Sequence, residues 1–441
     1  MSLLRDEEYF KIAEVKAREI LDSKGIPMVE VDVVTNGGVL GRAGAPCGIS
    51  AGKYEAVTLR DNDSSRYLGL GVLKAITNIQ NVIAPKIIGK DVRMQRQIDK
   101  IMIHLDGTER KANLGGNTTL SVSYAVAEAA ANALRLPLYR YIGGVNAHIL
   151  PLPMFNIING GPYSVTDLDF QEFMIMPKSA KSFSEVLRIS VEVYHELKKV
   201  LKKHYGKKGS TPGHAGGYSP PISDPMEAFD RILEAVDEAG HTGKIVLCLD
   251  CAASHIYDKK EGKYVFMGKK VTREFLMDFY EDLTKTYPLF LLEDPLHEDD
   301  FEGHAELTRD LTILIVGDDL FATNLKRLEK GVKMGAANGI ILKPNQIGTL
   351  SEAIDVAQFA MENKYAVIPS IRSCSRYIEP LADISVALNC KYCKFGAPTT
   401  GERTYHYNRL LQIEEELGLS LIHISEPTRP LYISYAVFCL K

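Results

Sequence analysis

Five charged residues stand at or near the ends of short apolar segments in the C-terminal two-thirds of the chain. The segments KIVLCLD, LFLLED, LTILIVGDD, GIILK and KYCKFG carry, in that order, Asp250, Glu293, Asp318, Lys343 and Lys394. In a barrel of parallel strands, catalytic side chains collect at the face where the strands end. If these segments are such strands, we expect the five side chains to converge at one rim.

Three converging carboxylates and two lysines suit a metal-assisted proton transfer. Carboxylate oxygens are ligands that Mg²⁺ prefers. A single strand-end acid commonly caps the next helix, whereas three on successive strands followed by a lysine favour a metal site. A lysine that acts as a base must lose a proton at an ordinary pKa of about 10.4, and a neighbouring lysine and a divalent metal would lower that pKa. Mg²⁺ would also neutralise the charge left when a proton is removed beside a carboxylate.

The elements that must position these residues follow from the pattern of apolar segments. Eight such segments recur from Leu150 onward with helix-length stretches between them: PMFNIING, EFMIMP, AVIPS and the five named above. Several are apolar without alternation, as strands covered on both faces are. This repetition over roughly 250 residues predicts an α/β fold, a (β/α)8 barrel.

The N-terminal part has a different pattern, which predicts an α+β domain. Alternating valines in PMVEVDVV precede the turn signal Asn36-Gly37-Gly38, so a hairpin or meander is expected. Helical periodicity then follows over residues 70–88, 92–105 and 118–136. We therefore divide the chain into an N-terminal capping domain, a barrel and a tail, with the bounds 1–145, 146–418 and 419–441. The tail contains LIHISEPTRP, which resembles sequencing-adapter read-through, and we set it aside as non-native.

Bulk properties exclude several classes of function. The net charge of −4 and the pI of about 6.3 offer nothing to nucleic acid or an anionic membrane. We find no apolar run long enough to cross a bilayer, and the charged N-terminus MSLLRDEEYFK does not read as a secretory signal, so a cytoplasmic location is expected. Two CxxC pairs, at Cys248/Cys251 and Cys390/Cys393, could hold zinc, but their apolar surroundings favour cysteines that pack as small hydrophobic residues.

The chain resembles the enolase family. The strings AREILDSKGIPMVEV, NIINGG, QEFMIMP, CLDCAAS, LLEDP, VGDDL, LKPNQIGTLSE and RLLQIEEEL carry the resemblance from about Ala13 to Gly418. It implies a modified (β/α)8 barrel with an N-terminal α+β capping domain, two Mg²⁺ ions and a homodimer or higher homo-oligomer. It also implies a glycolytic lyase that converts 2-phosphoglycerate to phosphoenolpyruvate. A lysine base working with one or two Mg²⁺ is the known arrangement of that superfamily rather than something inferred from this sequence.

The resemblance assigns roles to residues of this chain. It makes Asp250, Glu293 and Asp318 the ligands of the first Mg²⁺, Lys343 the base and Lys394 its partner at the substrate carboxylate. Glu172 becomes a catalytic glutamate, because the family's second barrel strand runs antiparallel and brings the start of EFMIMP to the active face. It matches Ser50, on the substrate side, to a loop serine that reaches the second Mg²⁺. It matches Arg372 and Ser373 to the pair that binds the substrate phosphate.

The chain also departs from the family pattern around the leaving group. The family's GDEGG reads Gly213-His214-Ala215-Gly216-Gly217, so the acidic glutamate is alanine. Two family histidines are replaced by Tyr163 and Ile371. His214 or Tyr163 could supply a substitute acid, although a solvated loop histidine and a space-filling tyrosine are the simpler interpretations. General acid catalysis raises a reaction rate by about 10²–10⁴-fold, so we expect slower dehydration of 2-phosphoglycerate.

Three functions remain compatible with these residues. The first is the ordinary enolase reaction, with the departures compensated locally. The second, which we favour, is a diverged lyase that uses the same base and Mg²⁺ on a related phosphorylated or phosphonate carboxylate. The third is a noncatalytic binding or scaffold protein that keeps the fold. The survival of the metal ligands, lysines and arginine argues for a changed substrate over a lost activity.

Overall fold

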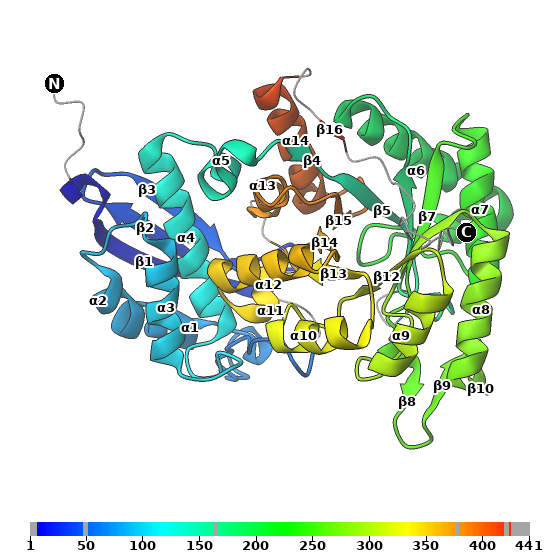
Figure 1. Cartoon of the computed structure of the whole chain (residues 1–441), viewed down its shortest axis with the longest axis horizontal. Helices are drawn as coiled ribbons and strands as arrows, with labels where there is room; N and C mark the ends of the chain where they lie inside the picture. The colour runs from blue at the N-terminus through cyan, green and yellow to red at the C-terminus, as the bar shows by residue number, and fades with distance from the viewer. Residues whose placement is uncertain are drawn as a thin grey trace, which may run out of the picture.

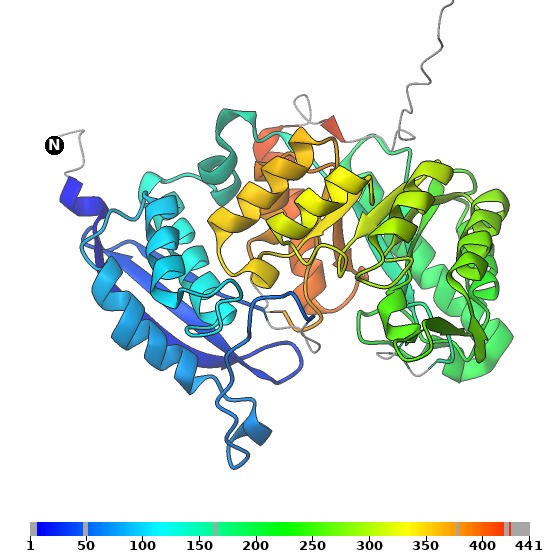
Figure 2. The ribbon, with the colours of Figure 1, turned by 60° about the horizontal axis from the view of Figure 1, so that its bottom comes forward.

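The computed structural model describes residues 7–46, 52–161, 164, 166–375, 379–418 and 423–424. Two predicted site residues, Ser50 and Tyr163, lie outside the described residues, as does most of the tail. The chain forms an N-terminal domain beside a larger barrel (Figures 1 and 2). In the described part, no helix is long and apolar enough to cross a membrane.

A three-stranded antiparallel sheet and a layer of helices make up the N-terminal domain. The sheet has the order β1-β2-β3, and β2 and β3 flank the predicted turn, which is confirmed. Its elements are η1 (Glu7–Phe10), β1 (Ile12–Leu21), β2 (Pro27–Thr35), β3 (Leu40–Gly44), η2 (Tyr67–Gly69), α1 (Leu73–Asn78), η3 (Ile79–Ile83), α2 (Ala84–Ile87), α3 (Gln95–Asp106), α4 (Gly116–Leu134), α5 (Leu138–Gly143) and η4 (Gly144–Asn146). The helix α4 is almost wholly buried, since it packs on β2 and β3.

The helical stretch predicted over 70–88 is not one regular helix. It begins at Leu73 and consists of α1, the π-helical segment η3 and α2. Pro85 lies at the start of α2. Proline has no backbone N–H and its ring clashes with the preceding turn, so the regular pattern of hydrogen bonds widens there.

All eight predicted barrel strands are confirmed, and they form one sheet. Its order is β14-β13-β12-β11-β7-β6-β5-β15, and a bridge between Ser370 and Lys394 joins the two ends. The strand β6 runs antiparallel to both neighbours, β5 and β7. The bounds are β5 (Leu152–Asn159), β6 (Glu172–Pro177), β7 (Ile245–Asp250), β11 (Leu289–Glu293), β12 (Leu314–Gly317), β13 (Gly339–Leu342), β14 (Ala366–Pro369) and β15 (Tyr392–Gly396).

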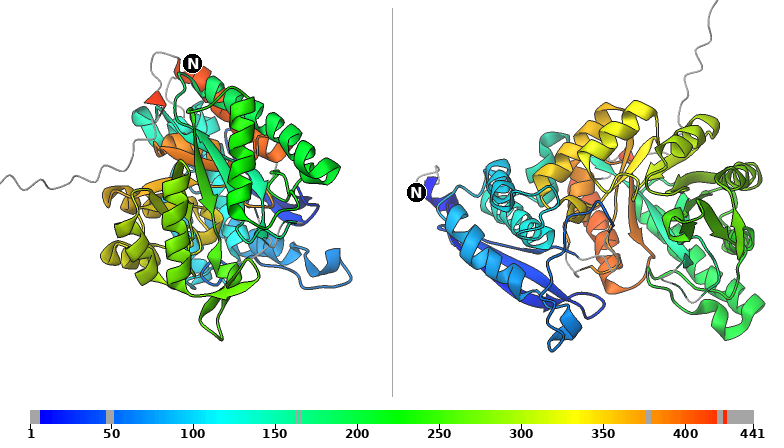
Figure 3. Two further views of the ribbon diagram at one scale, coloured as in Figure 1. Left: turned by 90° about the vertical axis from the view of Figure 1, so that its right-hand side faces the viewer. Right: turned by 90° about the horizontal axis from the view of Figure 1, so that it is seen from below.

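Helices surround this sheet and bury the outer faces of its strands (Figure 3). Strands β5, β11, β12, β13 and β15 are buried at every residue, which explains their unbroken apolar sequences. The helices are α6 (Phe183–Tyr205), η6 (Gly206–Ser210), α7 (Pro225–Glu238), η7 (Ala253–Ile256), α8 (Arg273–Thr286), α9 (Phe301–Asp310), α10 (Leu325–Met334), α11 (Pro344–Ile347), α12 (Leu350–Glu362), α13 (Leu381–Ala387) and α14 (Gly401–Leu417). Smaller strands are β4 (Ile149–Leu150), β8 (Tyr257–Asp258), β9 (Lys263–Phe266), β10 (Lys269–Val271) and β16 (His423–Ile424), which pairs with β4.

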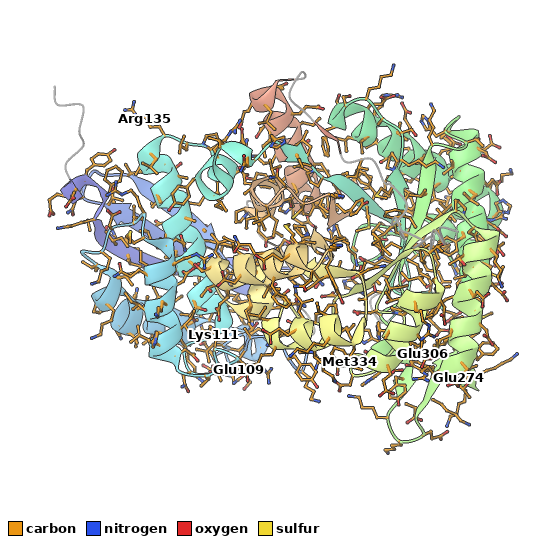
Figure 4. All side chains as sticks on the ribbon, in the orientation of Figure 1. Glu109, Lys111, Arg135, Glu274, Glu306 and Met334 are labelled. Carbon is orange, nitrogen blue, oxygen red and sulfur yellow. The ribbon has the colours of Figure 1, made fainter. Side chains whose placement is uncertain are left out.

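Ion pairs hold the N-terminal domain against the barrel. Lys111 Nζ lies 2.9 Å from Glu352 Oε1 on α12, and Lys326 Nζ of α10 lies 2.7 Å from Glu109 Oε1. Figure 4 labels Glu109 and Lys111 on the side of the domain that faces α10. Lys111 is buried, so its ion pair with Glu352 is an enclosed polar contact between the domain and the barrel.

The cysteines of both CxxC pairs are buried in the barrel. Cys248, Cys251, Cys390 and Cys393 are free thiols, and burial raises the pKa of each. Neutral, enclosed thiols behave as small apolar groups.

Candidate active site

The predicted acids gather at one end of the barrel. Asp250 and Glu293 are the last residues of the parallel strands β7 and β11, and they face each other in the register of the two strands. Asp318 directly follows β12, the next strand. Glu172 is the first residue of β6 and pairs with Asp250, because β6 runs in the opposite direction. The antiparallel strand therefore brings Glu172 to the same rim, as expected.

Lys394 lies at the centre of these carboxylates. Its Nζ is 2.8 Å from Asp250 Oδ2, 2.7 Å from Glu293 Oε2 and 2.8 Å from Glu172 Oε2. Burial alone would lower the pKa of Lys394, but the carboxylates of Asp250, Glu172 and Glu293 outweigh it and hold that pKa well above its ordinary value. Lys394 is therefore a fixed cation that holds three strand ends together.

The second lysine, Lys343, forms an ion pair with Asp318. Gln346 Nε2 donates to Asp318 Oδ1 at 3.0 Å, and Thr323 Oγ1 donates to Gln346 Oε1 at 2.6 Å and accepts from the Lys343 backbone N–H. Burial would lower the pKa of Lys343, as would Arg372, but Asp318 raises it above the ordinary value. Asp318 therefore favours the protonated form of Lys343, and a cation that engaged that carboxylate would weaken this effect.

The acids fit a divalent cation. Burial raises the pKa of Asp250 and of Glu293, while Lys343 outweighs burial at Asp318 and lowers the pKa of that carboxyl. When all are ionised, these three carboxylates and Glu172 carry four negative charges, of which the ammonium groups of Lys343 and Lys394 offset two, so negative charge remains among these described residues. Buried, anionic oxygen donors of this kind match the preference of Mg²⁺.

A neighbouring acidic cluster has a structural role. Among the described residues, carboxylate oxygens of Asp294, Asp318 and Asp319 lie within 4.8 Å of one another. The Asp294 carboxylate accepts from the backbone N–H of Asp318 at 3.0 Å and of Asp319 at 2.7 Å. Asp294 therefore holds the turn that presents Asp318. Burial, and then the charge of Asp318, raise the pKa of Asp319 to about 7.

A cavity of about 480 Å³ opens over this rim. Its lining includes Lys343 and Lys394 together with Arg372, Ser373 and the apolar side chains of Ala215 and Ile371. Arg372 is buried, and its Nη1 lies 3.0 Å from Glu55 Oε1. The structure thus brings together every predicted site residue that it describes, with two apolar side chains among them.

His214 lies at the edge of the cavity on an exposed loop. Its backbone oxygen accepts from Arg403 Nη2 at 3.0 Å and from Lys24 Nζ at 3.3 Å. Burial lowers the pKa of His214, and Lys24 and Arg403 lower it further. The residue is therefore neutral at pH 7, and these cations oppose the protonated form that a general acid would need.

Four polar residues that the sequence pattern does not mark also support the site. Gln171 Nε2 donates to Asp250 Oδ2 at 3.2 Å, and Asn156 Nδ2 donates to Glu172 Oε1 at 3.0 Å. Glu55 and Gln346 contact Arg372 and Asp318, as described above. Gln171 and Gln346 stand inside the strings QEFMIMP and LKPNQIGTLSE, close to the charged residues that those strings contributed.

The barrel has eight strands, one of them antiparallel, with a flanking α+β domain and a rim of acids and lysines. These features define the class of enolase-type barrels. The family model described as the enolase N-terminal domain matches residues 12–142, and that of the enolase C-terminal TIM barrel domain matches residues 147–427. The chain belongs to the enolase family. The second range ends beyond Gly418, and the domain bounds given above stay predictions.

Curated relatives from archaea agree with this assignment. The enolase of Methanocaldococcus jannaschii is 52% identical over 414 residues, which cover 94% of this chain and 97% of that protein. The enolase of Pyrococcus furiosus is 51% identical over 415 residues, 93% of this chain and 96% of that protein. The enolase of Methanosarcina barkeri is 50% identical over 420 residues, 95% and 97% of the two chains. Similarity over this length supports an enolase-like lyase.

Proposed function

We propose that the chain is a Mg²⁺-dependent lyase that removes the proton beside the carboxylate of a small phosphorylated 2-hydroxy acid or a phosphonate carboxylate. The observation that carries this proposal is the meeting of Lys343 and Lys394 with the carboxylates of Asp250, Glu293 and Asp318 at one buried rim. The glycolytic reaction, 2-phosphoglycerate to phosphoenolpyruvate, is the family's version of this chemistry.

In the proposed reaction, Lys343 takes the proton, Lys394 holds the substrate carboxylate, and Glu172, which pairs with Lys394, is a catalytic glutamate. Asp250, Glu293 and Asp318 would hold Mg²⁺. Mg²⁺ held there would neutralise the charge that collects on the substrate carboxylate and would weaken the hold of Asp318 on Lys343. That second effect is supported by the ion pair of Lys343 with Asp318, which favours the protonated form of the base.

The phosphate or phosphonate group is proposed to bind Arg372 and Ser373, with Ser50, Tyr163 and His214 completing the enclosure. Arg372 offers a planar pair of N–H donors that match phosphate oxygens. It is already buried at the cavity and held by Glu55.

We infer that the part of the site around the leaving group of the substrate has diverged from the family pattern. Ala215 and Ile371 line the cavity with groups that cannot donate a proton. A hydroxide leaves poorly without general acid help, which is worth about 10²–10⁴-fold. The proposed substrate is therefore one whose leaving group needs less protonation than the hydroxyl of 2-phosphoglycerate.

We further propose a homodimer or higher homo-oligomer, a cytoplasmic location, and small molecules rather than nucleic acid or membrane as partners. The acidic balance of the chain, with a net charge of −4, supports the last point.

The test separates proton removal from dehydration. The purified chain would be incubated with Mg²⁺ and 2-phosphoglycerate in D₂O, with α-deuterium followed by NMR and phosphoenolpyruvate by absorbance. We expect exchange that Lys343→Ala abolishes, with slow or undetectable dehydration. A rate of dehydration typical of enolases would contradict the divergence. Mg²⁺ binding without exchange on any phosphorylated or phosphonate carboxylate would instead favour a noncatalytic binding protein.

A further inference from the structure

The cavity has a second set of polar side chains that the proposed reaction does not use. We call it the outer wall; it consists of Lys53, Ser254, His255, Lys259, His297 and Glu298, all of which line the cavity. The residues from Ser254 to Lys259 follow β7, and His297 and Glu298 follow β11. Lys53, His255 and Lys259 are exposed, whereas Asp250 and Lys394 are buried. The outer wall therefore lies nearer the solvent than the acids and lysines of the rim.

His297 is the buried member of the outer wall, with 9% of its surface exposed. Its Nδ1 accepts a hydrogen bond from the backbone N–H of Asp299 at 3.2 Å. A ring nitrogen that accepts carries no proton, so the neutral ring is protonated at Nε2. Nε2 is buried and has no hydrogen-bond partner among the residues that the structure describes. The outer wall thus holds a buried N–H donor that the protein leaves unpaired.

Two tyrosines contact His297, one at its ring and one at its backbone. The His297 ring lies against Tyr257, with ring centroids 4.5 Å apart, and its backbone N–H donates to Tyr264 Oη at 3.0 Å. Burial lowers the pKa of His297, although the nearby acids Glu298 and Asp299 oppose this, so the ring is neutral at pH 7. A rigid, neutral, buried donor costs free energy until an acceptor reaches it.

A metal ion does not fit these atoms well, although His297, Glu298 and Asp299 have possible ligand atoms within 4.8 Å of one another. A metal at Nε2 would need the lone pair of a nitrogen that carries the proton in this arrangement. The carboxylate of Asp299 is already engaged, since it accepts from Tyr54 Oη at 2.7 Å and pairs with Arg327 at 3.3 Å. An acceptor atom is therefore the better match for His297.

The other groups of the outer wall favour an anionic acceptor. Ser254 Oγ accepts from the backbone N–H of Glu298 at 2.8 Å, which leaves its own O–H able to donate. Lys53 and Lys259 bring two exposed ammonium groups; Lys53 Nζ lies 3.6 Å from Asp299 Oδ2, and Lys259 Nζ lies 4.0 Å from Glu298 Oε1. N–H, O–H and ammonium donors together suit an oxyanion.

We propose that the outer wall binds a second anionic group of the substrate, a carboxylate or phosphate on a carbon beyond the reacting centre, with His297 Nε2–H as its buried donor. This inference rests on the proposed function, since it places the reacting carbon at Lys343. It identifies the substrate class as a carboxylate with a phosphate or phosphonate group and one further anionic arm. A cavity of about 480 Å³ is within the range of small-molecule sites and has room for that arm.

The experiment compares two ligands that differ by one arm. Phosphonoacetate carries a phosphonate and a carboxylate, and 2-phosphonosuccinate adds a carboxymethyl group. Their dissociation constants for the full chain with Mg²⁺ would be measured by calorimetry. We expect wild type to bind 2-phosphonosuccinate roughly tenfold more tightly, as a charge-assisted hydrogen bond allows. His297→Phe should abolish the preference, and His297→Gln, which keeps an N–H donor, should restore part of it.

A matched control separates this effect from a general loss of structure. His304 is buried and its Nε2 is likewise without a partner among the described residues, but it is not part of the cavity lining. His304→Gln should keep the tenfold preference. As a second measurement, the ¹⁵N resonance of His297 Nε2 in wild type should shift with 2-phosphonosuccinate and not with phosphonoacetate.

The outcomes distinguish the outer wall from the proposed reaction. Lys343→Ala should lose α-proton exchange and keep the preference for the longer ligand. One outcome is a wild type that shows no α-proton exchange and yet prefers the longer ligand. If His297→Phe removed that preference, the result would support the outer wall and refute the role of Lys343 as the base. Equal affinity for the two ligands in wild type, a preference unchanged in His297→Phe, or no binding of either ligand would overturn the inference.

Discussion

Glu55 of the N-terminal domain and Arg372 of the barrel form a buried ion pair, with 3.0 Å between Oε1 and Nη1. The same Glu55 oxygen lies 3.5 Å from Gln346 Nε2, which also donates to Asp318. One carboxylate thus connects the N-terminal domain to the arginine proposed to bind phosphate and to a proposed metal ligand. The negative charge of Glu55 therefore competes with that of a phosphate for the positive charge of Arg372.

Removing the charge of Glu55 should strengthen anion binding. In Glu55→Gln the side chain keeps its shape, but a neutral amide holds Arg372 less strongly than a carboxylate does. We expect inorganic phosphate to bind about tenfold more tightly than to wild type, measured by calorimetry. Glu352→Gln removes a charge from a different pair between the same two domains, with Lys111, and should leave phosphate affinity unchanged. Equal affinity in wild type and Glu55→Gln would refute the competition.

Asp250→Asn should weaken Mg²⁺ binding. Asp250 offers a buried carboxylate at the rim, and an amide oxygen carries no charge with which to hold a divalent ion. We expect at least about a tenfold lower affinity, measured as the Mg²⁺ concentration needed to raise the melting temperature. In the control, Asp169→Asn, the altered carboxylate accepts from the Met267 N–H outside the cavity lining, and the Mg²⁺ dependence should stay that of wild type. An unchanged Mg²⁺ dependence in Asp250→Asn would exclude this residue as a ligand.

Ala215→Glu should increase the dehydration of 2-phosphoglycerate. The substitution places a proton donor in the cavity at a position where the chain has a methyl group. We expect a gain on the order of 10²-fold in phosphoenolpyruvate formation, followed by absorbance. Ala215→Gln has the same size and no acidic proton, so it serves as the matched control. If Glu were no better than Gln, or wild type were already fast, general acid help would not limit the reaction.

The acids and lysines of the rim could be predicted because each lies in or directly after a short apolar strand, at or near its end. An unbroken apolar strand indicates burial on both faces, and the parallel strands of a barrel end at the same face. Asp250, Glu293 and Asp318 could therefore be placed at one rim from the sequence, without knowledge of their contacts. Glu172 needed the resemblance as well, since it starts its strand and only an antiparallel direction brings it to the rim.

Other features depend on contacts that the local sequence does not contain. Glu55 lies in a loop of the N-terminal domain, more than 300 residues before Arg372 in the chain, and no periodic pattern marks it. The same holds for His297, since the position of its ring follows from contacts with Tyr257 and with the backbone N–H of Asp299. In the helical stretch after Leu70, the apolar period was right, but Pro85 interrupted the hydrogen bonds that the period assumes.

The stability of the fold should depend on pH through His406, a histidine buried in α14. Its ring lies against Phe395, with centroids 4.8 Å apart, and neither ring nitrogen has a partner among the described residues. Burial, and then the charge of Arg403, lower the pKa of His406 from 6.5 to about 3. The unfolded chain therefore takes up this proton below about pH 6.5, while the folded chain stays neutral until about pH 3.

His406→Phe should remove this pH dependence. Above about pH 6.5, His406 is neutral in the folded and the unfolded chain, so it does not favour unfolding. As the pH falls from about 6.5 toward about 3, protonation of the unfolded chain lowers the free energy of unfolding progressively. Between about pH 8 and pH 5, we expect the free energy of unfolding of wild type to fall by about 2 kcal/mol more than that of the variant. Urea denaturation followed by circular dichroism at both pH values measures the difference. The exposed His195 of α6 provides the control, since His195→Phe should behave as wild type; a fall of equal size in wild type and His406→Phe would show that His406 is not the group responsible.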